Sequence, residues 1–409
     1  MIFTRFSSAI TQARISRSTA AQRLTRAFTV LAFESSADDT CVAIVDSSRK
    51  IHSNVVMKQH DIHEQFGGIY PMSAIGTHQQ NMPLAVRRAL DEANLDLIRD
   101  IDGIAFTRGP GMPGCLSVGM NAAKTLAAAT GKPLVGVHHM QGHALTPLLT
   151  SWPDVPQYPF LTLLVSGGHS LLLLATSSTS FKILATTQDE SIGRTFDKVS
   201  KLLELKWTSL GPGDALEKFC AEDPEIVTPA IPPLPRPMPG KLQFAFAALH
   251  SHIKLFTAGL RDGTEGIDLP ESLRQYINSL EGPNKFDMPM KKAIARAFQT
   301  AAVQQLEDKV KLALEYCIKK DIPVRSLVVS GGVASNQYLR TRLRECLDEF
   351  DSETPYSLVF PPPHLCTDNA VMIAWASMDR FLENDTDDYT IGLRPKWSIE
   401  DLTIEEDSK

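Results

Sequence analysis

Three histidines lie within six positions in the segment VHHMQGHALTP, which runs from Val137 to Pro147. His139 and His143 are four residues apart, so on a helix both imidazoles share one face and can reach a single metal ion. His138 lies one step off that face and is the weakest candidate ligand. Another interpretation is the start of a helix whose polar side chains face solvent.

Asp368, in the segment CTDNA, is the candidate third ligand. It stands between a proline-rich loop and an apolar stretch of helical character, so it could instead be the N-cap of that helix. Two imidazoles and one carboxylate leave coordination positions open for a substrate oxygen, as catalytic metal sites do. His139, His143 and Asp368 thus form the predicted metal site.

The same four-residue spacing occurs in the H-E-x-x-H metalloproteases, where a glutamate after the first histidine is the general base. Met140 and Gln141 follow His139 here, and neither side chain can accept a proton. A metallopeptidase is therefore disfavoured but kept as an alternative. A second alternative is an actin-like ATP-dependent chaperone or small-molecule kinase, which would not need the histidine pair.

Two similar apolar segments each end in Ser-Gly-Gly. They are LLVSGGHS from Leu163 and LVVSGGVAS from Leu327. Glycine turns expose backbone N–H groups and allow close approach, which suits a phosphate group. Each segment could also be a simple tight turn. Together they favour one shared nucleotide cleft.

Strands and helices alternate through both halves of the chain, which predicts an α/β fold. The predicted strands lie in residues 28–36, 40–48, 101–107, 132–137, 160–176, 325–330 and 356–360, and the predicted helices in 77–95, 115–130, 290–320 and 338–350. Gly131 is expected to end the second of these helices as a C-cap. Residues 221–240 contain seven prolines and are expected to form a loop or surface insertion.

The chain has 409 residues, which suits two lobes, and no apolar run reaches the roughly 18 residues of a membrane-spanning helix. Residues 1–28 contain five arginines and no acidic residue, as in a mitochondrial transit peptide; a basic arm that binds nucleic acid is the alternative. Without those residues the formal net charge changes from −6 to −11, so any RNA must bind to a local basic patch. The six cysteines show no C-x-x-C spacing, which fits a reducing compartment such as the mitochondrial matrix.

The segments VHHMQGH, LLVSGGH, FDK, VVSGGVASN and CTDNA occur in the same order in the tRNA N6-adenosine threonylcarbamoyltransferases. RGPGMPG and ESSADDT are also similar to that family, and the resemblance spans about Val30 to Pro395. It implies an α/β fold of the actin/Hsp70/sugar-kinase (ASKHA) type, with two lobes around a nucleotide cleft. With its transit peptide, the chain resembles the mitochondrial member.

The resemblance implies transfer of threonylcarbamoyl from threonylcarbamoyl-adenylate to N6 of the adenosine at tRNA position 37, in tRNAs that read ANN codons, with release of AMP. It implies one divalent metal ion per subunit, iron or zinc, and both accept two imidazoles and a carboxylate. It also implies an adenylate supplied by a separate synthase, a homodimer, and no membrane partner. No general base is assigned.

Carried over by motif, His139, His143 and Asp368 would hold the metal. The residues that would bind the adenylate are Leu164, Val165, Ser166, Gly167, Gly168, Asp197, Gly213, Glu217, Ser335 and Asn336. Gly211 competes with Gly213 for its place. The chain departs from the family at Ala37, where cysteine is common, and at Arg194, which follows Gly193 where an acid is usual; Arg194 would contact phosphate or face solvent.

The expected divisions are a transit peptide at 1–28, an N-terminal lobe at 29–158 with the metal-binding histidines, a C-terminal lobe at 159–400 with the adenylate loops, and an acidic tail at 401–409. Lysines and arginines should supply the surface that faces tRNA. The segment RTRLR from Arg340 is a candidate for that surface, and an ordinary solvated helix face is the alternative.

Overall fold

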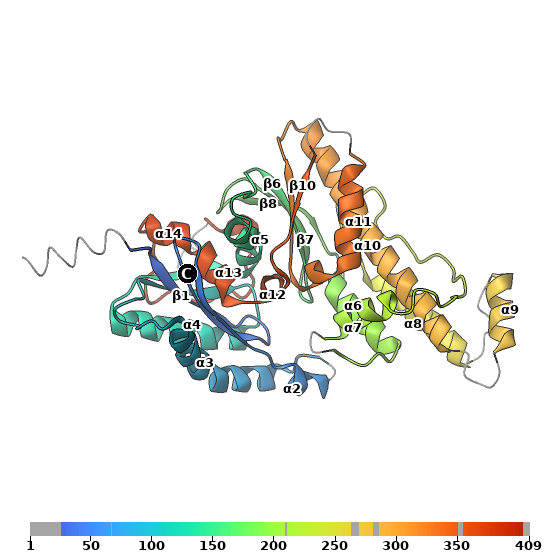
Figure 1. Ribbon diagram of the computed structural model, residues 1–409, viewed down its shortest axis with the longest axis horizontal. Helices are drawn as coiled ribbons and strands as arrows, with labels where there is room; N and C mark the ends of the chain where they lie inside the picture. The colour runs from blue at the N-terminus through green and yellow to red at the C-terminus, as the bar shows by residue number, and fades with distance from the viewer. Residues whose placement is uncertain are drawn as a thin grey trace, which may run out of the picture.

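The computed structural model describes residues 26–66, 68–208, 211–262, 270–280, 286–350 and 355–403. Residues 1–25 of the expected transit peptide and 404–409 of the expected acidic tail lie outside this part of the chain. The described residues form two lobes, each built on a five-stranded mixed sheet (Figure 1). The two-lobed α/β prediction is therefore confirmed.

The N-terminal sheet has the strand order β3-β2-β1-β4-β5, and the C-terminal sheet has the order β10-β9-β6-β7-β8. The strands are β1 (Thr29–Glu34), β2 (Thr40–Asp46), β3 (Ile51–Met57), β4 (Gly103–Gly109), β5 (Leu134–His138), β6 (Phe160–Val165), β7 (Ser170–Ala175), β8 (Phe181–Thr186), β9 (Ser326–Ser330) and β10 (Ser357–Val359). Counted along the chain, the first three strands of each sheet pair antiparallel to one another, and the fourth and fifth strands run parallel to the first. The two lobes thus repeat one topology.

Both faces of the N-terminal sheet are buried. On β1, Leu31 and Phe33 belong to an outer core, whereas Val30 and Ala32 belong to a central core between the two sheets. This alternation follows from the two-residue period of a strand. The outer face is covered by α3 (Pro71–Ala93) and α4 (Pro113–Thr130).

The central core is built around two helices that pack side by side, α5 (His139–Thr150) and α13 (Ala370–Ala376). Helix α5 follows β5 of the N-terminal sheet but also contacts β6 and β9 of the C-terminal sheet. Helix α13 follows the last strand of the C-terminal sheet and packs on β1 and β2. Figure 1 shows both helices between the sheets, so each lobe lends one helix to the interface.

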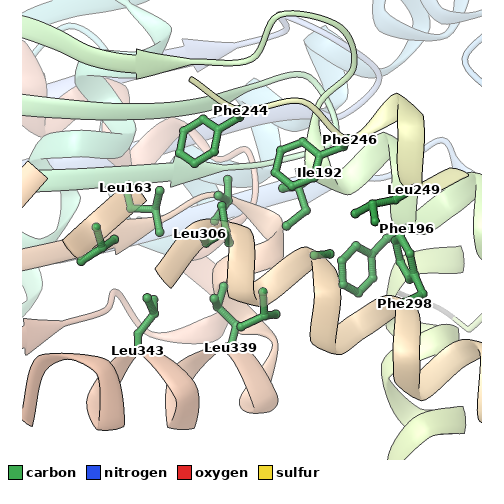
Figure 2. Close-up of a cluster of buried hydrophobic side chains, with 14 of the residues drawn as sticks. Leu163, Ile192, Phe196, Phe244, Phe246, Leu249, Phe298, Leu306, Leu339 and Leu343 are labelled. Atoms are coloured by element: carbon green, nitrogen blue, oxygen red, sulfur yellow. The ribbon is translucent and has the colours of Figure 1, made fainter. Parts of the chain in front are cut away.

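The outer face of the C-terminal sheet carries the largest core. In Figure 2, Leu163 from β6 faces Leu306 of one helix and Leu339 and Leu343 of another, while Phe196 lies against Phe298. The helices of this layer are α6 (Ile192–Leu202), α7 (Pro212–Ala221), α8 (Ala247–Asp262), α10 (Met288–Lys319) and α11 (Gln337–Asp348). The remaining short elements are α2 (His60–Glu64), α9 (Glu271–Ser279), η1 (Gly332–Ser335), α12 (Pro363–Cys366), α14 (Met378–Leu382) and η2 (Ile399–Asp401).

Most elements lie where the sequence predicted them. Gly131 ends α4 in the left-handed conformation, with φ of 63°, and residues 222–240 contain no helix or strand, as expected. Strands β3 and β8 were not predicted, because each lies at a sheet edge and its polar residues interrupt the apolar run. No helix among the described residues is both long enough and apolar enough to span a membrane.

Candidate active site

His139, His143 and Asp368 come together where α5 meets the start of α13. Asp368 Oδ1 lies 3.1 Å from Nε2 of His143 and 3.6 Å from Nε2 of His139. The two imidazole rings stand at 88° to each other with centroids 4.8 Å apart. One ligand atom from each residue therefore lies within 4.8 Å of the others, as the predicted metal site requires.

The alternative role of Asp368 as a helix cap is wrong. Asn369 is the N-cap of α13, and its Oδ1 accepts a hydrogen bond of 2.9 Å from the backbone N–H of Met372. Asp368 is left free to face the histidines. Burial opposes its ionisation, but His139 and His143 outweigh burial and hold the pKa of the Asp368 carboxyl well below its usual range.

Glu34 orients the first histidine from the end of β1. Its Oε2 lies 3.2 Å from Nδ1 of His139, and Ser36 Oγ lies 3.3 Å from the same nitrogen. With Nδ1 engaged in this way, Nε2 of His139 faces Asp368. The Glu34 carboxylate is itself held by hydrogen bonds from the Ser36 N–H and the Thr107 hydroxyl. A carboxylate behind a histidine is the usual support of a metal ligand.

The charges around His139 also fit a cation. Burial alone would lower the pKa of His139, but Glu34 and Asp368 on either side raise it to about 9. Asp39 lies nearby with its Oδ1 buried and without a hydrogen-bond partner among the described residues. Burial, followed by Asp38 and Asp368, raises the pKa of Asp39 to about 8. So many carboxylates in one buried place favour a bound cation.

The other two histidines nearby have different roles. His138 caps α5: its Nδ1 accepts a bond from the Met140 N–H at 3.1 Å, and its Nε2 donates to the Trp397 carbonyl at 3.0 Å. Burial lowers the pKa of His138 to about 3, so it is a neutral structural residue and not a ligand. His169, which was assigned no role in the sequence analysis, has its ring centroid 6.3 Å from that of His139. Burial, followed by His139, lowers its pKa to about 4.

The two Ser-Gly-Gly turns lie side by side. Strands β6 and β9 are parallel neighbours with Leu164 opposite Ser330, so both turns leave the same edge of the sheet. Gly331 has φ of 97°, and a Cβ there would lie 2.4 Å from the Val165 carbonyl oxygen. Only glycine allows this approach.

The first turn, Ser166 to Gly168, has backbone open to a ligand. A Cβ on Gly167 or Gly168 would meet no atom within 4 Å. On the inner side, Gly193 at the start of α6 closes on the turn, because a Cβ there would lie 2.6 Å from the Ser166 oxygen.

The side chains of Leu164 and Val165 belong to the two hydrophobic cores. If these two residues line a pocket, they would do so with their backbone.

The remaining predicted adenylate residues lie on elements around η1. Asp197 on α6 accepts a hydrogen bond from the backbone of Gly213, and burial raises its pKa to about 6 although Lys201 opposes the shift. Gly213 rather than Gly211 therefore contacts Asp197. Glu217 Oε1 accepts a bond of 2.6 Å from the Gln337 N–H, and burial raises the pKa of Glu217.

Ser335 and Asn336 lie at the junction of η1 and α11. Asn336 caps α11 by accepting a bond of 2.9 Å from the Leu339 N–H, and Ser335 Oγ donates to the Gly332 carbonyl at 2.7 Å. A Cβ on Gly332 would lie 3.7 Å from the Thr367 side chain, the neighbour of Asp368. The second glycine turn therefore links the metal group to the predicted adenylate residues. Arg194, on the first turn of α6, is exposed.

Comparison with known proteins agrees with this arrangement. The family model described as TsaD, tRNA N6-adenosine threonylcarbamoyltransferase, matches residues 50–375. A protein of that name from Paramagnetospirillum magneticum is 37% identical over 375 residues, which cover 91% of this chain and 97% of the relative. A probable mitochondrial tRNA N6-adenosine threonylcarbamoyltransferase from Arabidopsis thaliana is 35% identical over 90% of this chain and 74% of its own length.

Among solved structures, T. kodakarensis HypF aligns with a TM-score of 0.52 at 12% identity, covering 88% of this chain and 49% of that one. At this identity the likeness concerns the fold alone.

Proposed function

The chain belongs to the tRNA N6-adenosine threonylcarbamoyltransferase family, and from this premise we propose how its residues divide the reaction. The threonylcarbamoyl group passes from threonylcarbamoyl-adenylate to N6 of the adenosine at tRNA position 37, and AMP leaves. The observation that carries the proposal is the buried His139–His143–Asp368 group, linked through Gly332 and Thr367 to the paired glycine turns.

His139, His143 and Asp368 would hold one divalent ion, iron or zinc, since both accept two imidazoles and a carboxylate. When bound, the ion supplies positive charge that neutralises phosphate and polarises the acyl donor. Glu34 keeps Nε2 of His139 turned toward the ion by holding Nδ1. The remaining positions of such a site are open to a substrate oxygen.

The adenylate would lie against the glycine turns. The exposed backbone of Gly167 and Gly168 suits its phosphate, because backbone amides at a turn form an anion-binding concavity. Ser166 shapes this turn, since its N–H donates to the His169 carbonyl and its Oγ accepts from the Gly168 N–H. Asp197 and Glu217 suit its ribose, since ionised carboxylates accept hydrogen bonds from hydroxyl groups. The backbone of Leu164 and Val165, together with Ser335 and Asn336, would complete the pocket.

The protein contributes to the reaction largely by positioning the nucleophile. The exocyclic amine of adenosine is a weak nucleophile, so holding it against the acyl carbon at reacting distance is the main contribution open to the protein. A peptidase reaction is poorly supported, because Met140 is packed in the central core and Gln141 donates to the Ser178 carbonyl. Neither can act as a general base.

We further propose a mitochondrial location, because residues 1–28 are rich in arginine and lack acids, and because a relative of similar identity carries a mitochondrial name. The lobe boundaries 29–158 and 159–400, a homodimer, and a separate synthase that supplies the adenylate belong to the same proposal.

The test is product formation. The purified chain is incubated with threonylcarbamoyl-adenylate and unmodified tRNA that reads ANN codons, and the digested tRNA is examined by mass spectrometry for threonylcarbamoyladenosine. Product that depends on His139 supports the proposal. The absence of product, with the adenylate demonstrably intact and tRNA bound, would contradict it.

A further inference from the structure

The arginine-rich segment of α11 makes its polar contacts within the protein. Arg340 donates to the Ala334 carbonyl at 2.8 Å, Arg342 contacts Glu307 at 2.7 Å, and Arg344 contacts Asp348 at 2.8 Å. Each of these arginines is engaged within the protein. The alternative interpretation of RTRLR as an ordinary helix face is therefore favoured, and the polyanion has to be met elsewhere.

A basic hollow lies between α6 and α8, next to the predicted adenylate residues. Its volume is about 320 Å³, and it is lined by Lys198, Lys201, Leu202, Glu204, His250 and Lys254. Three lysines and a histidine thus lie around this hollow, in a chain whose net charge is −6. Lys198 and His250 also contact Glu190, at 2.6 Å and 3.8 Å. Lys201 and Lys254 are exposed at the rim.

Helix α6 carries residues of both this hollow and the candidate active site. Arg194, Lys198 and Lys201 follow one another at spacings of four and three residues, so they lie along one face of the helix. Asp197, between them in sequence, is the carboxylate that accepts from Gly213. A polyanion held along this face would therefore lie beside the adenylate pocket.

Trp207 connects the basic hollow to a second one between the lobes. Lys201 Nζ lies 5.3 Å from the centroid of the Trp207 ring. The second hollow, of about 310 Å³, is lined by Lys58, His60, Asp61 and Glu64 from the N-terminal lobe and by Trp207 and Thr208 from the C-terminal lobe.

The second hollow and the metal group both act on Asp38. Burial, followed by Asp368, raises the pKa of Asp38, and His60, which lines the hollow, opposes the shift.

The two hollows differ in charge. The first is mainly basic and suits phosphates, whereas the second carries both signs and an indole ring, which suits a base. Single-stranded RNA is recognised in this way, by cations along its backbone and aromatic rings against its unstacked bases. An acidic protein segment would use the lysines but would have no need of the indole ring.

Resting on the proposed function, we propose that the anticodon loop of the substrate tRNA binds across α6 and α8. Lys201 and Lys254 contact its phosphates, Trp207 stacks on one base, and the target adenosine enters through the interlobe hollow.

The test uses the full chain and a fluorescein-labelled, unmodified anticodon stem-loop. Replacing both Lys201→Gln and Lys254→Gln should weaken binding roughly tenfold at moderate salt and reduce the slope of log affinity against log salt by about 1.4, near 0.7 for each lost contact to single-stranded RNA. The matched control replaces Lys319→Gln and Lys320→Gln, two exposed lysines at the far end of α10. The control should bind like the unaltered chain.

Two further variants test whether the Trp207 indole ring stacks on a base. Trp207→Ala should weaken the stem-loop about tenfold, and Trp207→Phe should recover most of the loss, because stacking needs only an aromatic face. AMP affinity should be unchanged in every variant. It is measured at pH 8 because Lys201 lowers the pKa of Asp197, and at this pH Asp197 stays ionised even when Lys201 is replaced. The KM for tRNA should rise while kcat stays near its unaltered value.

Two failures can be told apart. If the unaltered chain binds the stem-loop but forms no threonylcarbamoyladenosine, the proposed function fails. If it does form product and the Lys201/Lys254 variant binds RNA as tightly as the unaltered chain, or no more weakly than the control, only this inference fails. The hollow would then have to be assigned to another polyanion, such as an acidic protein segment.

Discussion

The two lobes share a strand order, but the connection between the first two strands of each sheet suits a ligand of opposite charge in the two lobes. In the N-terminal lobe, β1 leads to β2 through a loop that begins after Glu34 and contains Asp38 and Asp39. In the C-terminal lobe, β6 leads to β7 through the open turn from Ser166 to His169. One connection collects carboxylates and favours a cation, and the other has the open backbone of Gly167 and Gly168, which suits a phosphate. Under the proposed function, this common framework would place the ion and the adenylate close together.

The fifth strands make a second comparison. After β5 the chain enters α5 with its two histidines, and after β10 it leads through α12 to Asp368 and α13. The proposed metal ligands thus come from corresponding places in the two lobes. The following predictions, from the largest expected effect to the smallest, test whether two parts of the site have different roles. The acidic half is Glu34, His139, His143 and Asp368, and the glycine half is the turn from Ser166 to Gly168 together with Asp197.

His143→Ala should abolish the function of the acidic half. With one of three ligands gone, bound metal should be lost and kcat should fall by at least about a thousandfold. Metal content by elemental analysis and product by mass spectrometry check this together. AMP should still bind to the glycine half, but more weakly, because the ion no longer neutralises its phosphate, and full activity without stoichiometric metal would contradict the role.

Glu34→Gln should loosen the support of His139 without removing a ligand. The neutral amide is a poorer acceptor for the Nδ1 proton, so metal affinity should fall between about 10- and 100-fold. Competition with a chelator measures this change. Unaltered affinity would show that Ser36 alone holds the imidazole.

The glycine half should show its own pH dependence through Asp197. Its pKa of about 6, raised by burial, means that the carboxylate is ionised at pH 8 and protonated at pH 5. Losing the acceptor for ribose hydroxyls should weaken AMP about tenfold at pH 5. The sign for stability is the opposite: the raised pKa stabilises the fold below the unfolded value near 3.8 and loses that contribution as pH rises through 6. Calorimetric titration of AMP with Asp197→Asn should give a flat profile over the same range.

Gly193→Ala and Gly167→Ala separate the inner and outer sides of the first turn. A Cβ on Gly193 collides with the Ser166 oxygen, so this variant should lose about 1–3 kcal/mol of unfolding free energy and a few-fold of AMP affinity. A Cβ on Gly167 enters open space, so stability should be retained while AMP affinity falls. Thermal denaturation and AMP titration give both readouts, and retained AMP affinity in Gly167→Ala would place the phosphate elsewhere.

Much of the site could be predicted from local spacing. His139 and His143 needed only the four-residue helical repeat, and the Ser-Gly-Gly turns needed only apolar runs before them. Glu34 could not be assigned in this way, because its contact with His139 joins residues 105 positions apart. The signal available was a carboxylate ending a wholly buried strand. The basic hollow escaped prediction for a similar reason, since its lysines lie on α6 and α8, which are separate in sequence.

The crossing of α5 and α13 between the sheets has a consequence for biosynthesis. The inner face of the N-terminal sheet is covered by α13, and Asp368 follows His143 by 225 residues. A chain emerging from the ribosome therefore forms its first sheet long before the helix that covers it exists. During that interval an apolar face is open to chaperones, and the two histidines lack Asp368. If the proposed ion binds there, its firm retention would mark a chain whose synthesis has passed α13, and the ion would be loaded late in assembly.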